Sequence, residues 1–539
     1  MAADARAARL FAAIGIVAAA AVFLPAQVAH VRHSADRFIF NDDARQWAVP
    51  FFGGAFDGDW TSRYYRSITP AGQRALYTLA DAEAVSKILP YVALALTCWL
   101  AAATTFALTG SRTAAVITVC LLLSTAALMA RMGGGSARAF GFPIVAAAMY
   151  ALASGRMGIA AIATIAGAAF YPPAGVLAGV TLALSIFIRD AESWRPRRQL
   201  VLVAVTAAVS IGLLLPLVLS SRGYGRGITP ADAGAYPEAG PHGRYAAGDR
   251  PPFPPLLTAA YRALDRGLTP GGTPLLPRRV HRGAVARAVV LALAGIGLLL
   301  LARSSRGARR LLLLPAASLL LYALAAWLSP RLYIPTRYVA YSLVLLPAIA
   351  IPAAAFALPR RRLSIALCVA IVLFLGGTGS STAGLTVDAR RDAALYDRLA
   401  RMPELKLLAG WPAGPVDNVP YLSRKPALVT YETHAALHAG ALDVMRARML
   451  ALIDAYFASS PEPLIRLRES FGVTHLLVDR RHFAGVPARY FAPFDRATAA
   501  AVRKLGDQQA VVLRQARHAA VFEYGPYVLL DLERLATAD

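Results

Sequence analysis

The chain has 539 residues, of which 57% are hydrophobic and only 16% charged, and its mean hydropathy is +0.50. A soluble protein of this length needs far more polar surface, so the composition excludes one. The formal net charge of +25 raises the question of nucleic-acid binding, but the arginines punctuate apolar runs and form no single basic tract. This arrangement favours membrane lipids with anionic head groups as partners, and no nucleic acid.

Apolar runs of membrane-spanning length recur along most of the chain. About 20 apolar residues in a helix cross the roughly 30 Å hydrocarbon core of a bilayer. The sequence therefore predicts about eleven spans, over residues 8–29, 88–109, 113–130, 141–154, 157–170, 173–188, 200–220, 285–302, 311–328, 338–357 and 362–378. The first run, which ends near Ala26-Gln27-Val28-Ala29, has some features of a signal peptide, and a retained span is the favoured interpretation.

Basic residues in the short loops set the orientation, because such loops stay in the cytoplasm. If the N-terminus is cytoplasmic, every loop predicted to lie inside carries arginine, from Arg112 and Arg156 to residues 360–362. The pattern therefore predicts a cytoplasmic N-terminus and an external C-terminus. The Ala- and Arg-rich, Lys-poor composition indicates a bacterium with GC-rich DNA, so the expected location is the bacterial cytoplasmic membrane with a periplasmic or extracellular C-terminal domain.

The fold expected is mostly α, a polytopic transmembrane helix bundle followed by an extracytoplasmic α/β domain. The bundle covers residues 1–380, with external loops at 30–87 and 221–284, and the domain covers 381–539. Helices are predicted in the domain over residues 441–457 and 463–471. Strands are predicted there over residues 427–431, 473–478, 510–513, 520–524 and 527–530.

Ionisable residues are nearly missing from the centres of the predicted spans. Proton-coupled transporters usually bury Asp, Glu or His near mid-membrane, so the sequence argues against ion-coupled transport. Chemistry is expected instead at the external membrane surface.

The first external loop contains two adjacent carboxylates, Asp42 and Asp43, flanked by aromatic residues. A carboxylate in this place can act as a general base on an acceptor hydroxyl or hold a divalent metal. Since neighbouring side chains point in different directions, one of the pair is expected to face the chemistry while the other supports the loop. The alternative is that Asn41 or Asp42 only caps a helix beginning near Ala44.

Arginines also occur in loops that the topology places outside. Arg131 and Arg138 bracket three glycines, and Arg331 and Arg337 lie in a later loop. Guanidinium groups form forked, charge-assisted hydrogen bonds to phosphate, so a phosphate-bearing ligand at the outer surface would explain them. Contacts with lipid head groups or with the external domain are the alternative. No Walker-type loop is present, so a lipid-linked phosphate ester is the activated substrate that this location suits.

Three features together resemble the GT-C glycosyltransferases, which include protein mannosyltransferases, the lipid A aminoarabinose transferase and oligosaccharyltransferases. These are the odd-numbered bundle, the acidic motif in the first large external loop, and Arg337-Tyr338 near the start of a late span. The resemblance covers about residues 8–380. It implies an inverting transfer of a sugar from a polyprenyl-phosphate donor to a cell-envelope acceptor, which stays unknown.

The resemblance also implies roles for individual residues. Asp42 or Asp43 would be the catalytic aspartate, and the metal ligand if a divalent metal takes part; the cofactor otherwise stays open. Arg337 would contact the donor phosphate, and Arg331, Arg138 and Tyr171 are further candidates for that contact, placed by topology. The aspartate would orient or deprotonate the acceptor, and arginine would stabilise the departing phosphate.

The sequence departs from the resemblance in two places. It lacks the Trp-Trp-Asp signature of oligosaccharyltransferases, which argues against protein N-glycosylation. Residues 411–425, with Trp411, Asp417 and Arg424, do not resemble the best-studied members and indicate an uncharacterised bacterial branch.

The histidines of the C-terminal domain are expected to have structural roles. His475 is expected to be a packed, hydrogen-bonded residue of a strand. His434 and His438, four residues apart, have the spacing of zinc ligands on a helix face, but no third ligand accompanies them.

Two other function classes stay open beside glycosyl transfer. One is a non-catalytic membrane scaffold or assembly factor that binds through the external domain. The other is a carrier for a lipid-linked glycan.

Overall fold

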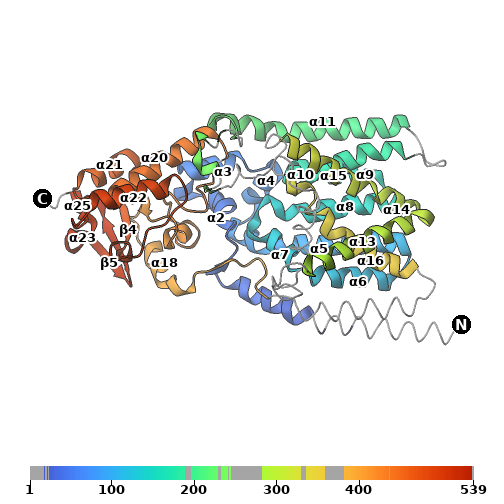
Figure 1. Ribbon diagram of the computed structural model, residues 1–539, viewed down its shortest axis with the longest axis horizontal. Coiled ribbons are helices and arrows are strands. Elements are labelled where there is room, and N and C mark those ends of the chain that lie inside the picture. The colour runs from blue at the N-terminus through green and yellow to red at the C-terminus, as the bar shows by residue number, and fades with distance from the viewer. Residues whose placement is uncertain are drawn as a thin grey trace.

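The structure, a computed structural model, describes residues 23–188, 196–228, 282–328, 335–357, 381–435 and 437–536, with isolated positions between 17 and 21 and between 232 and 244. The molecule is elongated, with long apolar helices in one half and the C-terminal domain at the opposite end (Figure 1). The short helices of the first external loop lie between the two.

The apolar half is a helix bundle. Its helices are α5 (Ala82–Thr109), α6 (Arg112–Leu123), α7 (Ala126–Met132), α8 (Gly141–Ser154), α9 (Met157–Phe170), α10 (Pro172–Leu184), α11 (Pro196–Ser221), α13 (Arg282–Ser304), α14 (Arg306–Leu311), α15 (Leu313–Trp327) and α16 (Ser342–Ala357). Within the described residues, five helical stretches are long and apolar enough to cross a membrane, or six if a bent pair is counted as one span. The predicted spans over 8–29 and 362–378 lie mostly or wholly outside the described residues. The predicted count of about eleven therefore stays a prediction.

The span predicted over 113–130 is formed by two helical stretches, residues 112–123 and 128–135, that meet at a bend of 68°. Its prediction as one crossing of the membrane stays a prediction. The hydroxyls of Ser124 and Thr125 each donate to the carbonyl oxygen of Leu121 at 2.8 Å. Thr125 itself has an extended backbone, with φ −94° and ψ 91°. Side-chain hydroxyls that compete for helical carbonyl oxygens account for a break at this point.

Small residues bring α9 and α10 together. A Cβ atom on Gly167 would meet the backbone of Gly175, so only glycine permits the approach. Such close backbone packing is a common means of helix association in membranes. By contrast, α11 lies along the outer edge of the bundle (Figure 1), and only 6% of its most apolar stretch of 18 residues is buried.

The C-terminal domain is built on a four-stranded mixed sheet of order β3-β4-β6-β5. Its strands are β3 (Leu408–Gly410), β4 (His475–Asp479), β5 (Ala520–Tyr524) and β6 (Tyr527–Asp531), of which only β3 and β4 are parallel neighbours. Its helices are α18 (Ala393–Ala400), α19 (Val419–Leu422), α20 (Ala439–Tyr456), α21 (Glu462–Phe471), α22 (Phe494–Leu505), α23 (Val511–Arg514), α24 (Ala516–Ala519) and α25 (Leu532–Ala536). Leu467, Leu476 and Leu530 belong to the apolar core of the domain.

Most predicted elements of this domain are confirmed. Both predicted helices form, as α20 and α21, and three predicted strands form, as β4, β5 and β6. The strand predicted over 510–513 is wrong, since α23 occupies that place. An apolar run of four residues carries too little periodicity to separate a helix from a strand. The strand predicted over 427–431 is also wrong, because that segment contributes one isolated bridge, from Ala427 to Leu408.

The first external loop joins the two halves of the molecule. It contains β1 (Ile39–Phe40), α2 (Ala44–Trp47), α3 (Trp60–Ser67) and α4 (Ala71–Leu79). Strand β1 pairs with β2 (Val387–Asp388), which follows the bundle in the chain. One apolar cluster contains Phe40 of the loop, Leu94 of α5 and Leu395 of α18. The boundary predicted between residues 380 and 381 stays a prediction, and a continuous core crosses it.

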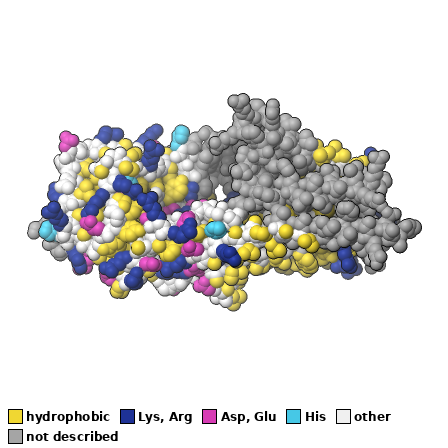
Figure 2. Space-filling view, turned by 90° about the horizontal axis from the view of Figure 1, so that it is seen from below, with side chains coloured by type: hydrophobic (Ala, Val, Ile, Leu, Met, Phe, Trp, Pro, Cys, Tyr) yellow, Lys and Arg dark blue, Asp and Glu magenta, His cyan; other side chains and the backbone are white. Residues whose placement is uncertain are grey.

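The two halves differ on the surface as well. Figure 2 shows charged side chains gathered on the half that carries the C-terminal domain, with apolar side chains along the described part of the other half. This distribution and the apolar helices identify a membrane protein with a water-exposed domain at one end.

Candidate functional site

The candidate site is centred on residues 39–47, which we call the site loop. Asn41 shapes its turn, because Asn41 Oδ1 accepts from the backbone N–H of Asp43 at 3.0 Å, and Nδ2 donates to the carbonyl oxygen of Gly384 at 2.5 Å. Gly134 packs directly against this turn with φ +71°, and a Cβ atom there would lie 2.5 Å from Asn41 Oδ1. The site loop is thus held between the Gly-rich turn after α7 and the chain just before β2.

Helix capping does not explain the two carboxylates. Helix α2 begins at Ala44, as predicted, and its N-cap residue is Asp43, whose side chain makes no capping hydrogen bond. Asn41 and Asp42 stand outside the cap position. Asn41 Oδ1 nevertheless accepts the N–H of Asp43 in the same turn, so the alternative that Asn41 caps this helix stays open, and it leaves the Asp42 and Asp43 carboxylates available for other contacts.

The two aspartates have different surroundings. Asp43 is 9% exposed and forms an ion pair with Arg138. Asp42 is half-buried, and its Oδ1 accepts from the hydroxyl of Thr386 at 2.9 Å and from the N–H of Asp43 at 3.2 Å. Among the described residues, no hydrogen bond reaches Asp42 Oδ2. One carboxylate is thus neutralised by an arginine, while the other keeps an unengaged oxygen.

The arginines that the sequence predicts as phosphate ligands lie in two groups. Arg138 contacts Asp43, as described above. Arg131 lies 5.9 Å from the ring centre of Tyr341, whose hydroxyl donates to that of Tyr171 at 3.1 Å. Tyr171 is buried at the start of α10, and its predicted contact with the donor phosphate stays a prediction.

Arg337 lies half-buried in a short 3-10 turn, Pro335–Tyr338, that precedes α16. This turn packs against α15 and α10. The ion pairs between described residues join Asp43 to Arg138 and connect Arg337 with neither aspartate. Arg331 lies outside the described residues, so its predicted role stays a prediction.

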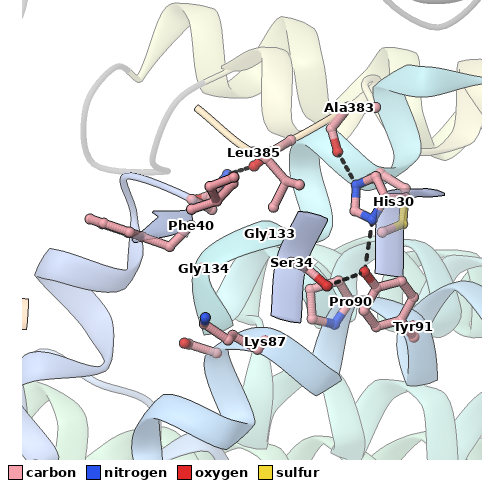
Figure 3. A pocket seen from close by; sticks show the side chains of 15 residues that line it. His30, Ser34, Phe40, Lys87, Pro90, Tyr91, Gly133, Gly134, Ala383 and Leu385 are labelled. Carbon is pink, nitrogen blue, oxygen red and sulfur yellow. Dashed lines mark hydrogen bonds between the residues drawn. The ribbon is translucent and has the colours of Figure 1, made fainter. Parts of the chain in front are cut away.

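A cavity opens beside the site loop, between residues 30–34 and the first turns of α5 (Figure 3). Its volume is about 20 Å³, or about 360 Å³ when the open space at its mouth is counted. Its lining contains His30, Ser34, Phe40, Asn41, Ser86, Lys87, Tyr91, Gly133, Gly134 and Gly384. Asn41 of the site loop and the Gly-rich turn that packs against it therefore also line the cavity.

Polar groups on the cavity wall are held in a chain of hydrogen bonds. The His30 ring bonds the hydroxyl of Tyr91 at 2.8 Å and the carbonyl oxygen of Ala383 at 2.7 Å, and Ser34 bonds the same tyrosine hydroxyl (Figure 3). Lys87 donates to the carbonyl oxygen of Asp36 at 2.8 Å. The Lys87 ammonium group provides a positive charge that an anionic ligand can use, while both ring nitrogens of His30 are engaged within the protein.

Sequence reasoning missed Lys87 and His30. One signal was present, because Lys87 is the only lysine before Lys406 in this arginine-rich chain. No local motif, however, indicated that these side chains and the site loop meet.

A buried cluster of charges lies on the other side of the site loop. Arg45, 9% exposed, donates to Asp417 and, at 2.8 Å, to Asn418 Oδ1, and it lies 3.6 Å from Glu432. Arg244 donates to Glu432 at 2.9 Å. Burial raises the pKa of the Asp417 and Glu432 carboxyls, and outweighs the nearby guanidinium groups that lower it.

The predicted zinc-like pair of histidines does not form. His434 Nδ1 bonds the hydroxyl of Tyr490 at 3.1 Å, while His438 Nδ1 bonds that of Tyr64 at 3.1 Å. Helix α20 begins only after His438, so the two rings share no helix face. His475 is buried in β4 with Nδ1 3.0 Å from the Thr474 hydroxyl, as expected for a packed residue.

A divalent ion at the site loop would draw mainly on Asp42, because Asp43 is engaged by Arg138. Within the described ranges, no group of three or more His, Cys, Asp or Glu side chains is placed to hold a metal ion. The metal requirement therefore stays open.

Comparison with known proteins bears on the fold. No protein-family profile and no curated protein matches the sequence. Among solved structures, ArnT from Cupriavidus metallidurans bound to undecaprenyl phosphate superposes with a TM-score of 0.53, at 13% identity, over 97% of this chain and 98% of ArnT. The chain has the GT-C fold.

Two further structures are more distant. The oligosaccharyltransferase AglB from Archaeoglobus fulgidus, in complex with an inhibitory peptide and a dolichol-phosphate, has a TM-score of 0.45 at 13% identity, over 93% of this chain and 72% of AglB. The arabinofuranosyltransferase AftD from Mycobacteria has a TM-score of 0.42 at 15% identity, over 86% of this chain and 35% of AftD. The predicted resemblance is thus confirmed as a fold, with ArnT matching from end to end.

Proposed function

We propose that this protein is an inverting glycosyltransferase that moves a sugar from a polyprenyl-phosphate donor to a cell-envelope acceptor. The reaction takes place at the outer face of the bacterial cytoplasmic membrane, with the N-terminus cytoplasmic and the C-terminal domain outside. The observation that carries the proposal is the cavity beside the site loop, which Lys87 and Asn41 line, the latter next to Asp42 in the chain. The full-length similarity to ArnT, whose structure holds undecaprenyl phosphate, supports the donor class.

The acid–base part of the reaction falls to Asp42. Its Oδ1 is fixed by Thr386, so Oδ2 can orient the acceptor hydroxyl and take its proton as the acceptor oxygen bonds the anomeric carbon. The bond between that carbon and the phosphate oxygen breaks on the opposite face, and the sugar is inverted. Asp43 holds Arg138 in place and supports the loop.

The leaving group is polyprenyl phosphate, which gains one negative charge as the bond breaks. Lys87 is the cation that lines the cavity, and we assign further stabilisation of this charge to Arg337 and Arg331 of the later loop. The charge of Arg138 is already compensated by Asp43, so we assign it a smaller share than Lys87. The bond electrons end on phosphate oxygen and the acceptor proton ends on Asp42, which balances the reaction.

Transfer by the purified chain in proteoliposomes tests this proposal. The donors are labelled sugars on polyprenyl phosphate, and the acceptors are an envelope extract. We expect Asp42→Asn to lower the transfer rate by about 10²–10³-fold, and Lys87→Ala by a similar factor, because each removes a group that acts on the transition state. Asp57→Asn is the matched control, since Asp57 is an exposed carboxylate of the same loop.

Three results would count against the proposal. Wild-type transfer rates in the Asp42→Asn/Asp43→Asn double variant would remove both aspartates from the mechanism. Movement of labelled lipid across the bilayer without a new glycosidic bond would indicate a carrier. A wild-type chain without transfer, whose double variant still supports growth, would indicate a scaffold.

The topology is tested separately by labelling. A cysteine introduced at Asp57 should react with a membrane-impermeant maleimide in intact spheroplasts. Reaction only after lysis would place the site loop in the cytosol and exclude the proposed reaction at the outer face.

A further inference from the structure

Residues 415–424 of the C-terminal domain, which we call the clamp segment, lie against the site loop. They belong to the stretch that does not resemble the best-studied GT-C members. The segment consists of a 3-10 turn, Pro415–Asn418, followed by α19 and by Ser423 and Arg424. Four of its side chains reach the first external loop, through three kinds of contact.

The first contact is the buried charge pair between Asp417 and Arg45. Arg45 Nη1 donates to Asp417 and to Asn418 Oδ1, while its Nε donates to the backbone oxygen of Asp42 at 3.3 Å. One guanidinium group therefore joins the C-terminal domain directly to the backbone of the proposed general base. Asp417 is itself fixed by the N–H of Glu432 at 2.9 Å.

The second contact is aromatic. The ring of Tyr421 stacks on Phe40, with 4.3 Å between ring centres, and its hydroxyl bonds the Ser86 hydroxyl at 3.2 Å. Phe40 begins the turn that Asn41 completes, and it also lines the cavity. The stacked pair therefore fixes the entry of the site loop.

The third contact comes from Arg424. Its guanidinium carbon lies 3.3 Å from the ring centre of Phe52, and it forms an ion pair with Glu83 in the first turn of α5. Arg424 has a φ of +56°, in the left-handed region that side-chain-bearing residues rarely occupy. A strained residue persists where surrounding contacts fix it, which is the case here.

These contacts differ from ordinary domain packing in what they hold. Arg45 and Asp417 are both almost fully buried, so removing Asp417 leaves Arg45 with only the more distant Glu432 carboxylate, at 3.6 Å, in a place that water hardly reaches. The chain around Arg45 would then move to hydrate the guanidinium group. Since Arg45 is bonded to the Asp42 carbonyl oxygen, such a movement shifts the carboxylate as well.

We propose that Asp417, acting through Arg45, is a positioning residue that holds Asp42 in its productive orientation, and that the clamp segment is the part of the C-terminal domain that completes the active site. This inference rests on the proposed function. It assigns the domain a role in the rate of the chemical step, separate from binding of the acceptor. A misplacement of about 1 Å at a reacting group costs on the order of 100-fold in rate.

The test compares Asp417→Asn with Asp479→Asn in the full-length chain. Asp479 is a matched control, because it is 9% exposed against 7% for Asp417 and lies in the same domain. It pairs with Arg481, which is not a residue of the site loop. We expect Asp417→Asn to lower kcat by about 10- to 100-fold with the donor KM within about twofold. Asp479→Asn should leave both constants within about twofold of the wild type.

Hydrogen–deuterium exchange in nanodiscs gives a second readout that needs no activity. Asp417→Asn should accelerate exchange of the amides of residues 42–48, and Asp479→Asn should not. Asn418→Ala removes one side-chain acceptor of Arg45 and a 3.3 Å hydrogen bond from Asn418 Nδ2 to the Tyr396 hydroxyl. It should produce a smaller change in the same amides, which keeps the test usable if Asp417→Asn fails to fold.

The outcomes separate this inference from the proposed function. Unchanged exchange in the site loop, or an equal loss of kcat in Asp479→Asn, overturns the positioning role. If the wild-type chain transfers no sugar but Asp417→Asn and Asn418→Ala still loosen residues 42–48, the proposed function fails while the structural link between clamp segment and site loop stands.

Discussion

The membrane bundle and the C-terminal domain bury their side chains by opposite rules. In the bundle, α9 and α10 meet through Gly167 and Gly175, and α11 turns apolar side chains such as Leu215 outward. In the domain, apolar side chains such as Leu467 point inward, and buried charge is paired, as in Glu238 with Arg446.

The difference follows from the solvent of each half. Water expels apolar surface and so stabilises the domain core. Lipid tails are as apolar as leucine, so they provide no such force and leave close packing of small residues to hold helices together. One kind of substitution should therefore have unlike effects in the two halves, which the next four experiments examine in the full-length chain.

The same leucine deletion gives the sharpest contrast. Leu467→Ala leaves a cavity in the domain core and should lower the free energy of unfolding by about 2–5 kcal/mol. Leu215→Ala changes a side chain that is 52% exposed on α11, and should lower it by less than about 0.5 kcal/mol. Thermal unfolding in detergent, followed by tryptophan fluorescence, measures both. Equal shifts would mean that α11 is covered by another part of the protein.

Removing one partner of an ion pair tests the electrostatic side of the comparison. Glu238 is 1% exposed and accepts two hydrogen bonds from Arg446, at 2.7 and 2.6 Å. Arg446→Gln leaves that carboxylate without its cation. We expect a loss of about 2–3 kcal/mol, below the usual range for a fully buried pair because the Arg446 side chain is 27% exposed.

Arg480→Gln is the control for that experiment. Its partner Glu523 is exposed, so the loss should stay below about 1 kcal/mol. Limited proteolysis of residues 225–245 would report whether the second external loop detaches in Arg446→Gln. A stable, protease-resistant Arg446→Gln protein would contradict the assignment of this pair as an anchor.

A glycine substitution examines packing inside the bundle. Gly167→Val would drive a side chain into the backbone of Gly175, and should cost about 1–3 kcal/mol or reduce the yield of folded protein. Gly212→Val in α11 meets open space and should cost much less. Size-exclusion profiles and melting curves of the two variants compare them directly. Similar behaviour would indicate that α9 and α10 do not meet at this point.

The pH dependence of stability isolates one histidine of the domain. Burial lowers the pKa of His434 from 6.5 to about 3 in the folded chain, so the unfolded chain binds the extra proton between those values. Stability from this residue is complete above about pH 6.5 and falls by about 1.4 kcal/mol for each pH unit below it. His434→Gln should flatten the curve between pH 6.5 and 5. If the difference in unfolding free energy between the wild type and His434→Gln did not change with pH in that window, the His434 ring would be hydrated in the folded chain.

Local patterns in the sequence predicted the elements that local forces determine. The apolar runs gave most membrane helices, and Gly472, which ends α21 with φ +71°, gave the boundary between α21 and β4. Patterns failed where few residues carry the signal, as in α23, or where side-chain hydroxyls break an apolar run, as at Ser124. The topology predicted from the sequence puts Asp43 and Arg138 on the same side of the membrane, and the two side chains form an ion pair.

The rest of the site depends on contacts between distant parts of the chain. Thr386 meets Asp42 across 344 residues, and Arg45 meets Asp417 across 372. No window of sequence around Arg45 contains its partners, so the sequence does not indicate them. Lys87 and His30 line one cavity because His30 bonds Tyr91, which lies one turn along α5 from Lys87.

The pairing of β1 with β2 has a consequence for how the protein is made. The first external loop leaves the ribosome early, but its strand partner and the clamp segment emerge after the whole bundle. At about 5–20 residues per second, Arg45 waits roughly 20–70 s for Asp417. Nascent chains therefore pass through the membrane with an incomplete active site, and a chain that stops before residue 417 never acquires a finished one.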